Sequence, residues 1–396
     1  MAVLILAIVA AVFNSSAAIA DPFVHARGTQ FILNDKEFYV TGANNHYLPW
    51  ASEVEITRVL DDAVAMGANV IRTFLGPAIG SVDGSTVPTI WKFHNDEANS
   101  NDLNVHGNYV LYWDPAAGAM AINPDGMRRT DFLLAEAAKR HLKLLLSFID
   151  YWAYTGGSQQ MRAWYGGEGE DRFFFSDPRT VADYKAWIRF VIQRVNPLTG
   201  LAYGDDPTIF AWELMNESQA PAAVSAAWTA AMSAAVKSLD SNHMVASGAD
   251  GPNLADFGIP TIDFVTWHGY PKYRGITPAR FDTLIRRMCS LAGQQDKPVL
   301  LEEFGYARAN TDPGQAQAYR MWLDTLGSDH ACAGWLVWRL VARQDDGRYP
   351  RDEYDQFDIR RDDGDTWRLL SAAAHQGRSI THLVGSGELG EPGDGR

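Results

Sequence analysis

The sequence predicts an α/β fold, a single-domain (β/α)8 TIM barrel with long loops on one face. Two observations support this: the chain contains eight short apolar runs, and helical patterns lie between most of them. The runs are nearly continuous rather than alternating, as expected for parallel strands buried on both faces. They cover 38–44, 69–75, 142–150, 208–217, 243–250, 263–270, 298–305 and 333–340. Strand and helix repeated eight times close into a barrel.

Local signals mark the helices between these runs. A capping box that starts at Ser52 begins the first predicted helix, and Gly67 ends it. Asp177 followed by Pro178 begins another helix. Further helical patterns cover 220–239, 277–291 and 315–326. The connection 251–262 is too short for a full helix, so one unit of the predicted barrel is shortened.

Charge and composition restrict the expected partners. The net charge is −14 and the chain has no run of lysine or arginine, so nucleic acid is not an expected partner. An acidic surface also disfavours strongly anionic polymers and is compatible with neutral ligands. The thirteen tryptophans either build a large aromatic core or line a cleft, where flat rings stack on sugars. Composition leaves both interpretations open.

The N-terminal segment resembles a secretory signal. An apolar stretch is followed by Ala18-Ile19-Ala20, an A-x-A-like cleavage site, although the usual early lysine or arginine is missing. We therefore predict a signal peptide over 1–20, with a short uncleaved anchor as the alternative. No later segment reaches the roughly 20 uninterrupted apolar residues of a membrane span. The mature protein is expected to be secreted (extracellular or periplasmic), with a catalytic domain over 21–377 and a disordered tail over 378–396.

The two cysteines, Cys289 and Cys332, allow two interpretations. Export would permit a disulfide bridge between them, and two buried free thiols are the alternative. No Cys/His cluster has the spacing of a zinc site, so we expect no metal and no cofactor.

Polar and aromatic residues gather at the carboxyl ends of the predicted strands, where TIM barrels place their active sites. They are Arg72, Asp150, Trp152, Asn216, Glu217, His268, Tyr270, Glu302, Glu303, Trp335 and Trp338. Each has a structural explanation when taken alone, such as a buried ion pair, a core histidine or simple packing. Their convergence on one face predicts an active site. Two insertions on this face, 76–125 and 151–178, are rich in Trp, Tyr and Gly and are expected to shape a cleft.

Two carboxylates face each other across this predicted cleft. Glu217 follows the fourth strand and Glu303 ends the seventh, and glycoside hydrolysis needs two such groups. The motifs "AWELMNE", "WHGYP" and "KPVLLEEFG" resemble signatures of glycoside hydrolase family 5. "RVNPLTGLAYGDDPTIFAWELMNE", "YWAYTGG" and "NNHYL" resemble its endo-β-1,4-mannanase branch, and the similarity spans 25–375.

The resemblance implies roles for the site residues. Glu217 would be the acid/base, with a raised pKa, and Glu303 the nucleophile of a retaining mechanism, with carboxyl groups about 5–5.5 Å apart. Arg72 would hold Glu303 ionised, Tyr270 would hydrogen-bond the same carboxylate, and His268 would orient Glu217.

Further residues are expected to contact the substrate. Asn216 would bond the sugar 2-hydroxyl, Trp338 would form a platform under the cleaved sugar, and Trp152 would form the neighbouring wall. Asn45 and Trp335 are also expected to contribute to substrate binding. Glu302 is not expected to be the nucleophile, because adjacent strand residues point to opposite sides.

The sequence departs from the family pattern at two places. Related mannanases continue the acid/base motif as NEPR, whereas Ser218 and Gln219 follow Glu217 here, which puts leaving-group binding in doubt. Asp150 and Tyr151 replace a more usual pair of asparagines. Neither change affects the two predicted catalytic glutamates.

These observations predict a secreted, retaining endo-β-1,4-mannanase acting on mannan, glucomannan or galactomannan. An exo-β-mannosidase or an endo-β-1,4-glucanase of the same family is the alternative, and a non-catalytic carbohydrate-binding barrel is a remote one. The expected partner is a β-mannan-type polysaccharide or oligosaccharide, and a monomer is the simplest assembly.

Overall fold

The computed structural model describes residues 22–90, 108–352 and 355–377. The predicted signal peptide, the predicted tail and part of the first insertion lie outside the described residues. Within them, no helix is long and apolar enough to cross a membrane.

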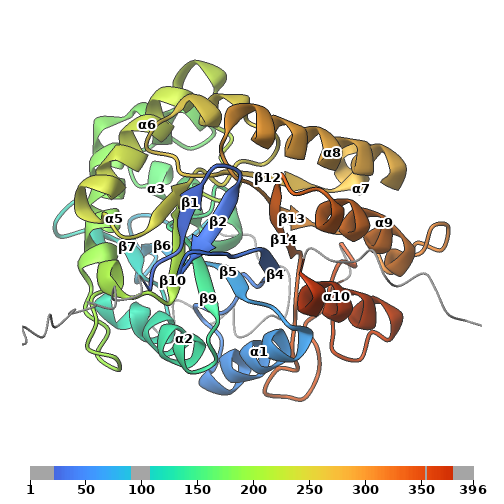
Figure 1. Ribbon diagram of the computed structural model, residues 1–396. Helices are drawn as coiled ribbons and strands as arrows, with labels where there is room; N and C mark the ends of the chain where they lie inside the picture. Colours follow the sequence, from blue (N-terminus) through green and yellow to red (C-terminus); the bar gives the residue numbers. More distant parts are fainter. Residues whose placement is uncertain (1–21, 91–107, 353–354, 378–396) are drawn as a thin grey trace, which may run out of the picture.

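Eight parallel strands form the central sheet, in the order β11-β10-β9-β5-β4-β14-β13-β12 (Figure 1). They are β4 (Val40–Asn44), β5 (Val70–Phe74), β9 (Lys143–Ser147), β10 (Ile209–Glu213), β11 (Met244–Ala246), β12 (Val265–Gly269), β13 (Val299–Phe304) and β14 (Cys332–Val337). Each falls within or overlaps one of the eight predicted runs. Between β11 and β12, the backbone N–H of Asp263 donates to the carbonyl of Val245 at 2.9 Å and helps to close the ring. The predicted barrel is confirmed.

Helices surround this ring (Figure 1). They are α1 (Glu53–Met66), α2 (Arg128–Lys139), α5 (Pro178–Gln193), α6 (Ala222–Leu239), α8 (Pro278–Gln295), α9 (Gln315–Ser328) and α10 (Asp365–Gln376). The predicted signals operate as expected: Ser52 caps α1 in a complete capping box, Gly67 ends it with φ 88°, and Asp177 caps α5. The short connection between β11 and β12 holds only a 3-10 turn, Leu254–Gly258, as predicted.

The two insertions pack against each other. The first contains the small sheet of β6 (Ala78–Ser81), β7 (Leu111–Asp114) and β8 (Ala119–Ile122), and the second contains α3 (Gly157–Ala163) and α4 (Asp171–Ser176). A Cβ on Gly156 would lie 1.9 Å from the carbonyl oxygen of Ala78, so only glycine allows this approach. Trp164 donates its indole N–H to the carbonyl of Ile79 at 2.9 Å. Both insertions follow strand ends, so they build one wall of the catalytic face.

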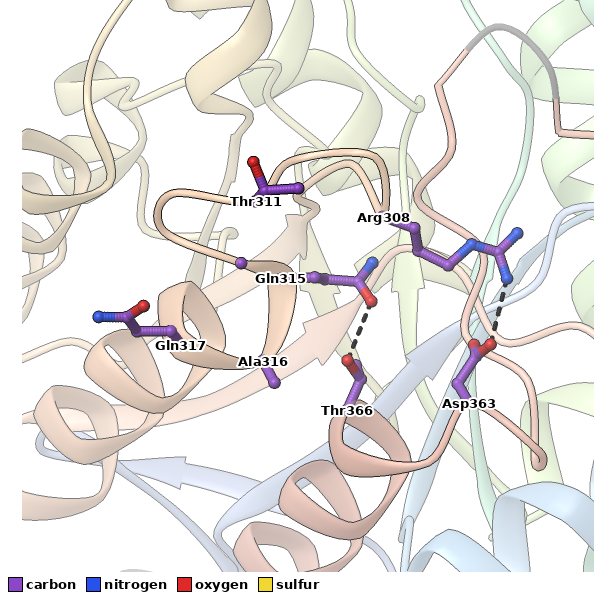
Figure 2. A pocket seen from close by; sticks show the side chains of 8 residues that line it. Arg308, Thr311, Gln315, Ala316, Gln317, Asp363 and Thr366 are labelled. Carbon is purple, nitrogen blue, oxygen red and sulfur yellow. Dashed lines mark hydrogen bonds and ion pairs between the residues drawn. The ribbon is translucent and has the colours of Figure 1, made fainter.

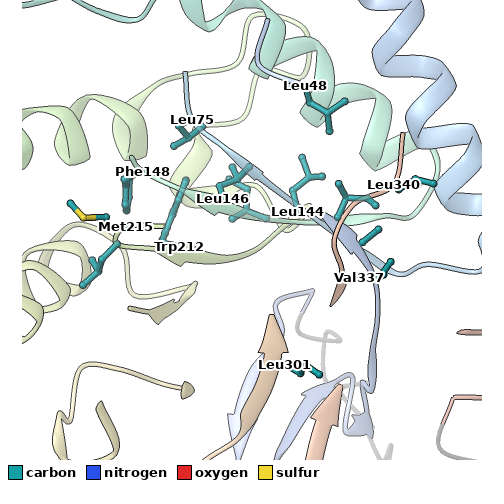
Figure 3. Packing of buried hydrophobic residues seen from close by; sticks show 14 of the residues in the cluster. Leu48, Leu75, Leu144, Leu146, Phe148, Trp212, Met215, Leu301, Val337 and Leu340 are labelled. Carbon is teal, nitrogen blue, oxygen red and sulfur yellow. The ribbon is translucent and has the colours of Figure 1, made fainter. Parts of the chain in front are cut away.

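The apolar core has two parts. Residues from the barrel strands fill the interior, and a hairpin of β1 (His25–Arg27) and β2 (Gln30–Leu33), followed by β3 (Lys36–Glu37), lies across one end at the centre of Figure 1. Phe31 of this hairpin meets the rings of Phe210 and Phe264 at 5.0 and 5.1 Å. A larger cluster lies between strands and helices (Figure 3). Apolar packing therefore closes the barrel at the end opposite the predicted site.

The two cysteines form a disulfide. Cys289 in α8 is bridged to Cys332 at the start of β14. This decides between the two interpretations that the sequence left open.

Candidate active site

The chain leaves β10 and places Glu217 beyond the end of the barrel. The backbone N–H of Asn216 donates to Ile149 at 2.9 Å, and that of Glu217 donates to Gly248 at 2.8 Å, so both neighbouring strand ends hold this segment. Glu217 adopts φ 51°, a left-handed conformation that is uncommon for residues other than glycine and that clusters at functional sites. Its carboxylate accepts from the Trp152 indole N–H at 2.6 Å.

Glu303, near the end of β13, faces Glu217 and is held by two donors. Arg72 Nη1 lies 2.5 Å from Glu303 Oε1, and the Tyr270 hydroxyl donates to Oε2 at 2.5 Å. A carboxylate oxygen of Glu217, a ring nitrogen of His268 and a carboxylate oxygen of Glu303 all lie within 4.8 Å of one another. The structure thus brings the two predicted catalytic carboxylates together across one space.

Arg72 is the buried cation beneath this pair. Glu213 binds it through Nε at 2.5 Å and Nη2 at 2.7 Å, and all three donor nitrogens of the guanidinium are engaged. Asn44 Oδ1 accepts from Nη1 at 3.0 Å, and Asn216 Oδ1 accepts from Nη2 at 2.7 Å. Glu213 and Asn44 are not among the site residues that the sequence predicts. An acidic residue inside a continuous apolar strand was the signal for Glu213, because a buried charge needs a partner.

His268 lies between the carboxylates of Glu217 and Glu302. Its Nδ1 lies 2.8 Å from Glu217 Oε1 and its Nε2 lies 3.2 Å from Glu302 Oε2. Burial alone would lower the pKa of His268, but the negative charge of Glu303 and the hydrogen bonds to Glu217 and Glu302 outweigh burial and raise it to about 10. A pKa of about 10 favours the imidazolium form of His268 at neutral pH.

The pKa expected for Glu217 is wrong in direction. Burial acts to raise it, but the hydrogen bonds from His268 and Trp152 and the charge of His268 outweigh burial and hold the pKa of Glu217 below its ordinary value. Burial raises the pKa of Glu303, even though His268 and Arg72 act in the opposite direction. These directions favour a protonated His268 beside an ionised Glu217.

A family model described as GH family 5 beta-mannosidase-like matches residues 123–329 of the sequence. The chain belongs to glycoside hydrolase family 5. It is 30% identical to mannan endo-1,4-beta-mannosidase 1 of Oryza sativa subsp. japonica, over 81% of this chain and 78% of the relative. It is also 30% identical to mannan endo-1,4-beta-mannosidase 7 of Arabidopsis thaliana, over 81% and 78%.

The fold is also similar to that of a solved structure. An endo-1,4-beta-mannanase from Rhizomucor miehei superposes with a TM-score of 0.74 at 26% identity, over 89% of this chain and 98% of the other. The two chains therefore share their fold over most of their length.

The tryptophan predicted as the sugar platform of this family 5 enzyme lies at the rim of the site. Trp338 is partly exposed, and its ring stacks on His46 at 5.5 Å and on Phe74 at 6.5 Å. Its supported ring is suited to carry a sugar face. Asn216 accepts from Arg72 and donates to Asp150 at 2.8 Å, which fixes the orientation of its amide.

Two residues predicted to contact the substrate are buried. Asn45 is fully buried: it donates to the carbonyl of Leu340 at 2.9 Å and accepts from the backbone N–H of Tyr47 at 3.1 Å. Trp335 is 2% exposed and packs on Phe304 in the layer between strands and helices. The asparagine of this loop that reaches the site is the preceding one, which ends β4.

The predicted orientation of Glu302 is also wrong. We expected Glu302 and Glu303 to point to opposite sides, yet both approach Arg72, at 3.5 and 2.5 Å. The register between β12 and β13 shifts at Trp267, so strict alternation fails there. Glu302 is fully buried below the site, and its assignment as a residue other than the nucleophile stays a prediction.

The site is distinct from the pocket in Figure 2, which has a volume of about 530 Å³. Its polar side chains pair with one another: Arg308 with Asp363 at 3.1 Å, and Gln315 with Thr366 at 3.1 Å. None of the predicted site residues lines it.

The spacing of Glu217, His268 and Glu303 would by itself allow a metal ion. Their surroundings do not fit one, because Arg72 places a fixed positive charge 2.5 Å from a Glu303 oxygen. The other Glu303 oxygen already accepts from Tyr270. The residues present therefore suit proton transfer and nucleophilic attack rather than cation binding.

Proposed function

We propose that this protein is a retaining endo-β-1,4-mannanase that cleaves internal bonds of mannan, glucomannan or galactomannan. The facing pair of Glu217 and Glu303 carries the proposal, because a carboxylate oxygen of each residue lies within 4.8 Å of one of the other. Retaining glycosidases hold their carboxyl groups about 5–5.5 Å apart, whereas inverting enzymes leave room for a water between them. The endo-mannosidases among the relatives support the choice of polymer.

In the first step, a Glu303 oxygen attacks the anomeric carbon and forms a covalent bond to it. The glycosidic C–O bond breaks, its electron pair stays on the departing oxygen, and Glu217 donates a proton to that oxygen. Arg72 and Tyr270 aim Glu303, because they donate to one of its oxygens each.

In the second step, water attacks the same carbon from the opposite side. Glu217, now a carboxylate, takes the proton from the water, and the bond to Glu303 breaks to release its carboxylate. Two inversions restore the starting configuration. Trp338 would support the sugar ring during both steps.

Export is part of the proposal. The segment 1–20 has the pattern of a secretory signal, and the Cys289–Cys332 bridge is a bond that persists in oxidising compartments. Mass measurement of the mature N-terminus from a secreting host would test it: a chain that begins near residue 21 is expected, and a retained apolar segment would contradict it.

Product analysis tests the activity. The wild type and Glu303→Ala would be incubated with linear mannan, glucomannan and soluble cellulose. A ladder of manno-oligosaccharides from the wild type, lost in the variant, is expected. Mannose released alone from chain ends would favour an exo-β-mannosidase, and release from cellulose alone would favour a glucanase.

Azide separates the roles of the two glutamates. In Glu217→Ala, azide needs no general base, so it should intercept the glycosyl-enzyme on Glu303 and give a β-mannosyl azide. In Glu303→Ala, it would enter from the opposite side and give the α-anomer. The reverse assignment of products would overturn the roles proposed here.

A further inference from the structure

Both ring nitrogens of His268 face carboxylate oxygens. Glu217 Oε1 lies 2.8 Å from Nδ1, and Glu302 Oε2 lies 3.2 Å from Nε2. The side chains of His268 and Glu302 are fully buried, so water does not compete for these contacts. An ionised carboxylate can only accept, so a ring held between two of them must donate from both nitrogens.

We propose that Glu302 and His268 form a proton relay behind Glu217, in which His268 holds the proton at rest and supplies it to Glu217 for cleavage. Glu302 is then a positioning residue that keeps the far nitrogen protonated. This inference rests on the proposed glycosidase function and adds the source of its proton.

The relay balances over the reaction. At rest the Nδ1 proton lies on His268 and Glu217 is a carboxylate. Transfer of this proton gives neutral His268, still protonated at Nε2 toward Glu302, and a neutral Glu217 acid. Glu217 then passes the proton to the departing oxygen as the C–O bond breaks. In the second step Glu217 takes a proton from water and returns it to His268.

The 3.5 Å approach of Glu302 to Arg72 does not account for its position, and its remaining side-chain contact is a hydrogen bond with Glu213. Arg72 already has Glu213 at 2.5 and 2.7 Å and Glu303 at 2.5 Å, whereas its nearest approach to Glu302 is 3.5 Å. Neutralising Arg72 therefore does not require Glu302. Protonation of His268 at Nε2 does require Glu302, because its hydrogen bond decides which ring nitrogen keeps its proton after transfer.

Several charges set the proton affinity of His268. Glu217 follows β10, while Glu302 and Glu303 belong to β13, with Glu303 Oε2 3.4 Å from Nδ1. Arg72 on β5 lies behind these glutamates, and Arg274 donates to the backbone carbonyl of His268 at 3.1 Å. The three carboxylates outweigh burial and raise the pKa of His268 to about 10.

The chain offers a matched pair of variants. Glu302→Gln and Glu213→Gln each replace a fully buried carboxyl group near Arg72 by an amide. Glu302 contacts the histidine of the relay, whereas Glu213 acts through Arg72 on the nucleophile. The two variants would be compared on aryl β-mannotriosides whose leaving groups are phenolate, which needs a proton, and 2,4-dinitrophenolate, which does not.

The readout is kcat/KM, which reports the first chemical step. Glu302→Gln should lose at least ~10-fold on the phenyl substrate and stay within about twofold on the dinitrophenyl substrate. Its alkaline pH limb should move to lower pH, because a neighbouring negative charge is lost. Glu213→Gln should lose similar factors on both substrates. Equal losses on both substrates for Glu302→Gln would overturn the relay.

Failure of the relay and failure of the proposed function are distinguishable. A wild type that releases neither leaving group would contradict the glycosidase function itself. Should Glu302→Gln not fold, nitrogen-15 NMR of histidine-labelled wild type answers the same question, with His268→Gln for assignment. Two protonated ring nitrogens at neutral pH are expected, and a neutral imidazole would overturn the relay.

Discussion

Glu213 accepts two hydrogen bonds from Arg72, at 2.5 and 2.7 Å, inside the barrel where both side chains are fully buried. This bidentate contact fixes one edge of the guanidinium. The remaining nitrogen then points to Glu303 at 2.5 Å. The fully buried Arg72–Glu213 pair thus positions the predicted nucleophile, Glu303, from inside the barrel.

Arg72→Ala should destabilise the fold. It would leave Glu213, Glu302 and Glu303 buried without this cation, and removing one partner of a buried ion pair costs roughly 3–5 kcal/mol. Urea unfolding measures the change. Arg72→Lys is the control: it keeps the charge but cannot bind Glu213 and Glu303 together, so it should lose more activity than stability. An unchanged unfolding midpoint in Arg72→Ala would contradict this account.

The two tryptophans of the eighth strand region should respond differently. Trp335→Ala removes a core side chain, so it should lower the free energy of unfolding by about 3–5 kcal/mol with little change in KM. Trp338→Ala removes an exposed ring face, so it should lower kcat/KM by roughly 10–100-fold with a smaller change in stability. Thermal unfolding and kinetics on mannotriose derivatives separate the two. If KM rose in Trp335→Ala but not in Trp338→Ala, Trp335 rather than Trp338 would be the substrate contact.

The disulfide should stabilise the barrel without affecting catalysis. Replacing Cys289 and Cys332 by alanine frees a loop of 43 residues, and loop entropy predicts a loss of about 4 kcal/mol. Cys332 begins β14, at the end of the barrel opposite the glutamates, so kcat should be retained. Unfolding of the wild type with and without reductant is the control. Equal midpoints in all samples would show that the bridge adds nothing.

Asp150 should make stability fall as pH rises. Burial raises its pKa to about 8, so the folded state keeps a proton that the unfolded chain releases near pH 4. This contribution is fully present below the unfolded pKa and is lost as pH rises through the folded pKa. Asp150→Asn should therefore flatten the decrease in Tm between about pH 4 and 8. Asp35→Asn, at an exposed position, should leave the slope unchanged, and equal slopes in all three proteins would exclude this role.

Much of the site could be predicted because strand ends can be located in the sequence. Apolar runs identify the strands, and parallel strands in a barrel bring their carboxyl ends to one face. Arg72, Glu217, His268, Tyr270 and Glu303 meet there as expected. The roles that the family resemblance implies for them remain predictions.

Errors arose where side-chain direction depends on the neighbouring strand. Alternation along one strand placed Glu302 away from the site, but the register shift between β12 and β13 turns it toward His268. Asn45 and Trp335 are also buried, whereas Asn44 accepts from Arg72 and Trp338 is partly exposed.

By itself the sequence predicted the barrel, the caps of α1 and the start of α5, and the two glutamates at strand ends, because apolar runs and capping motifs are local properties of the chain. The tertiary structure alone decided the Cys289–Cys332 bridge, the Glu213–Arg72 contact and the contacts of His268 with Glu217 and Glu302. Each depends on distances between residues far apart in the chain. Burial increases the effect of these contacts, because the ionisation of a group that water does not reach depends on its nearest charged or hydrogen-bonding partner.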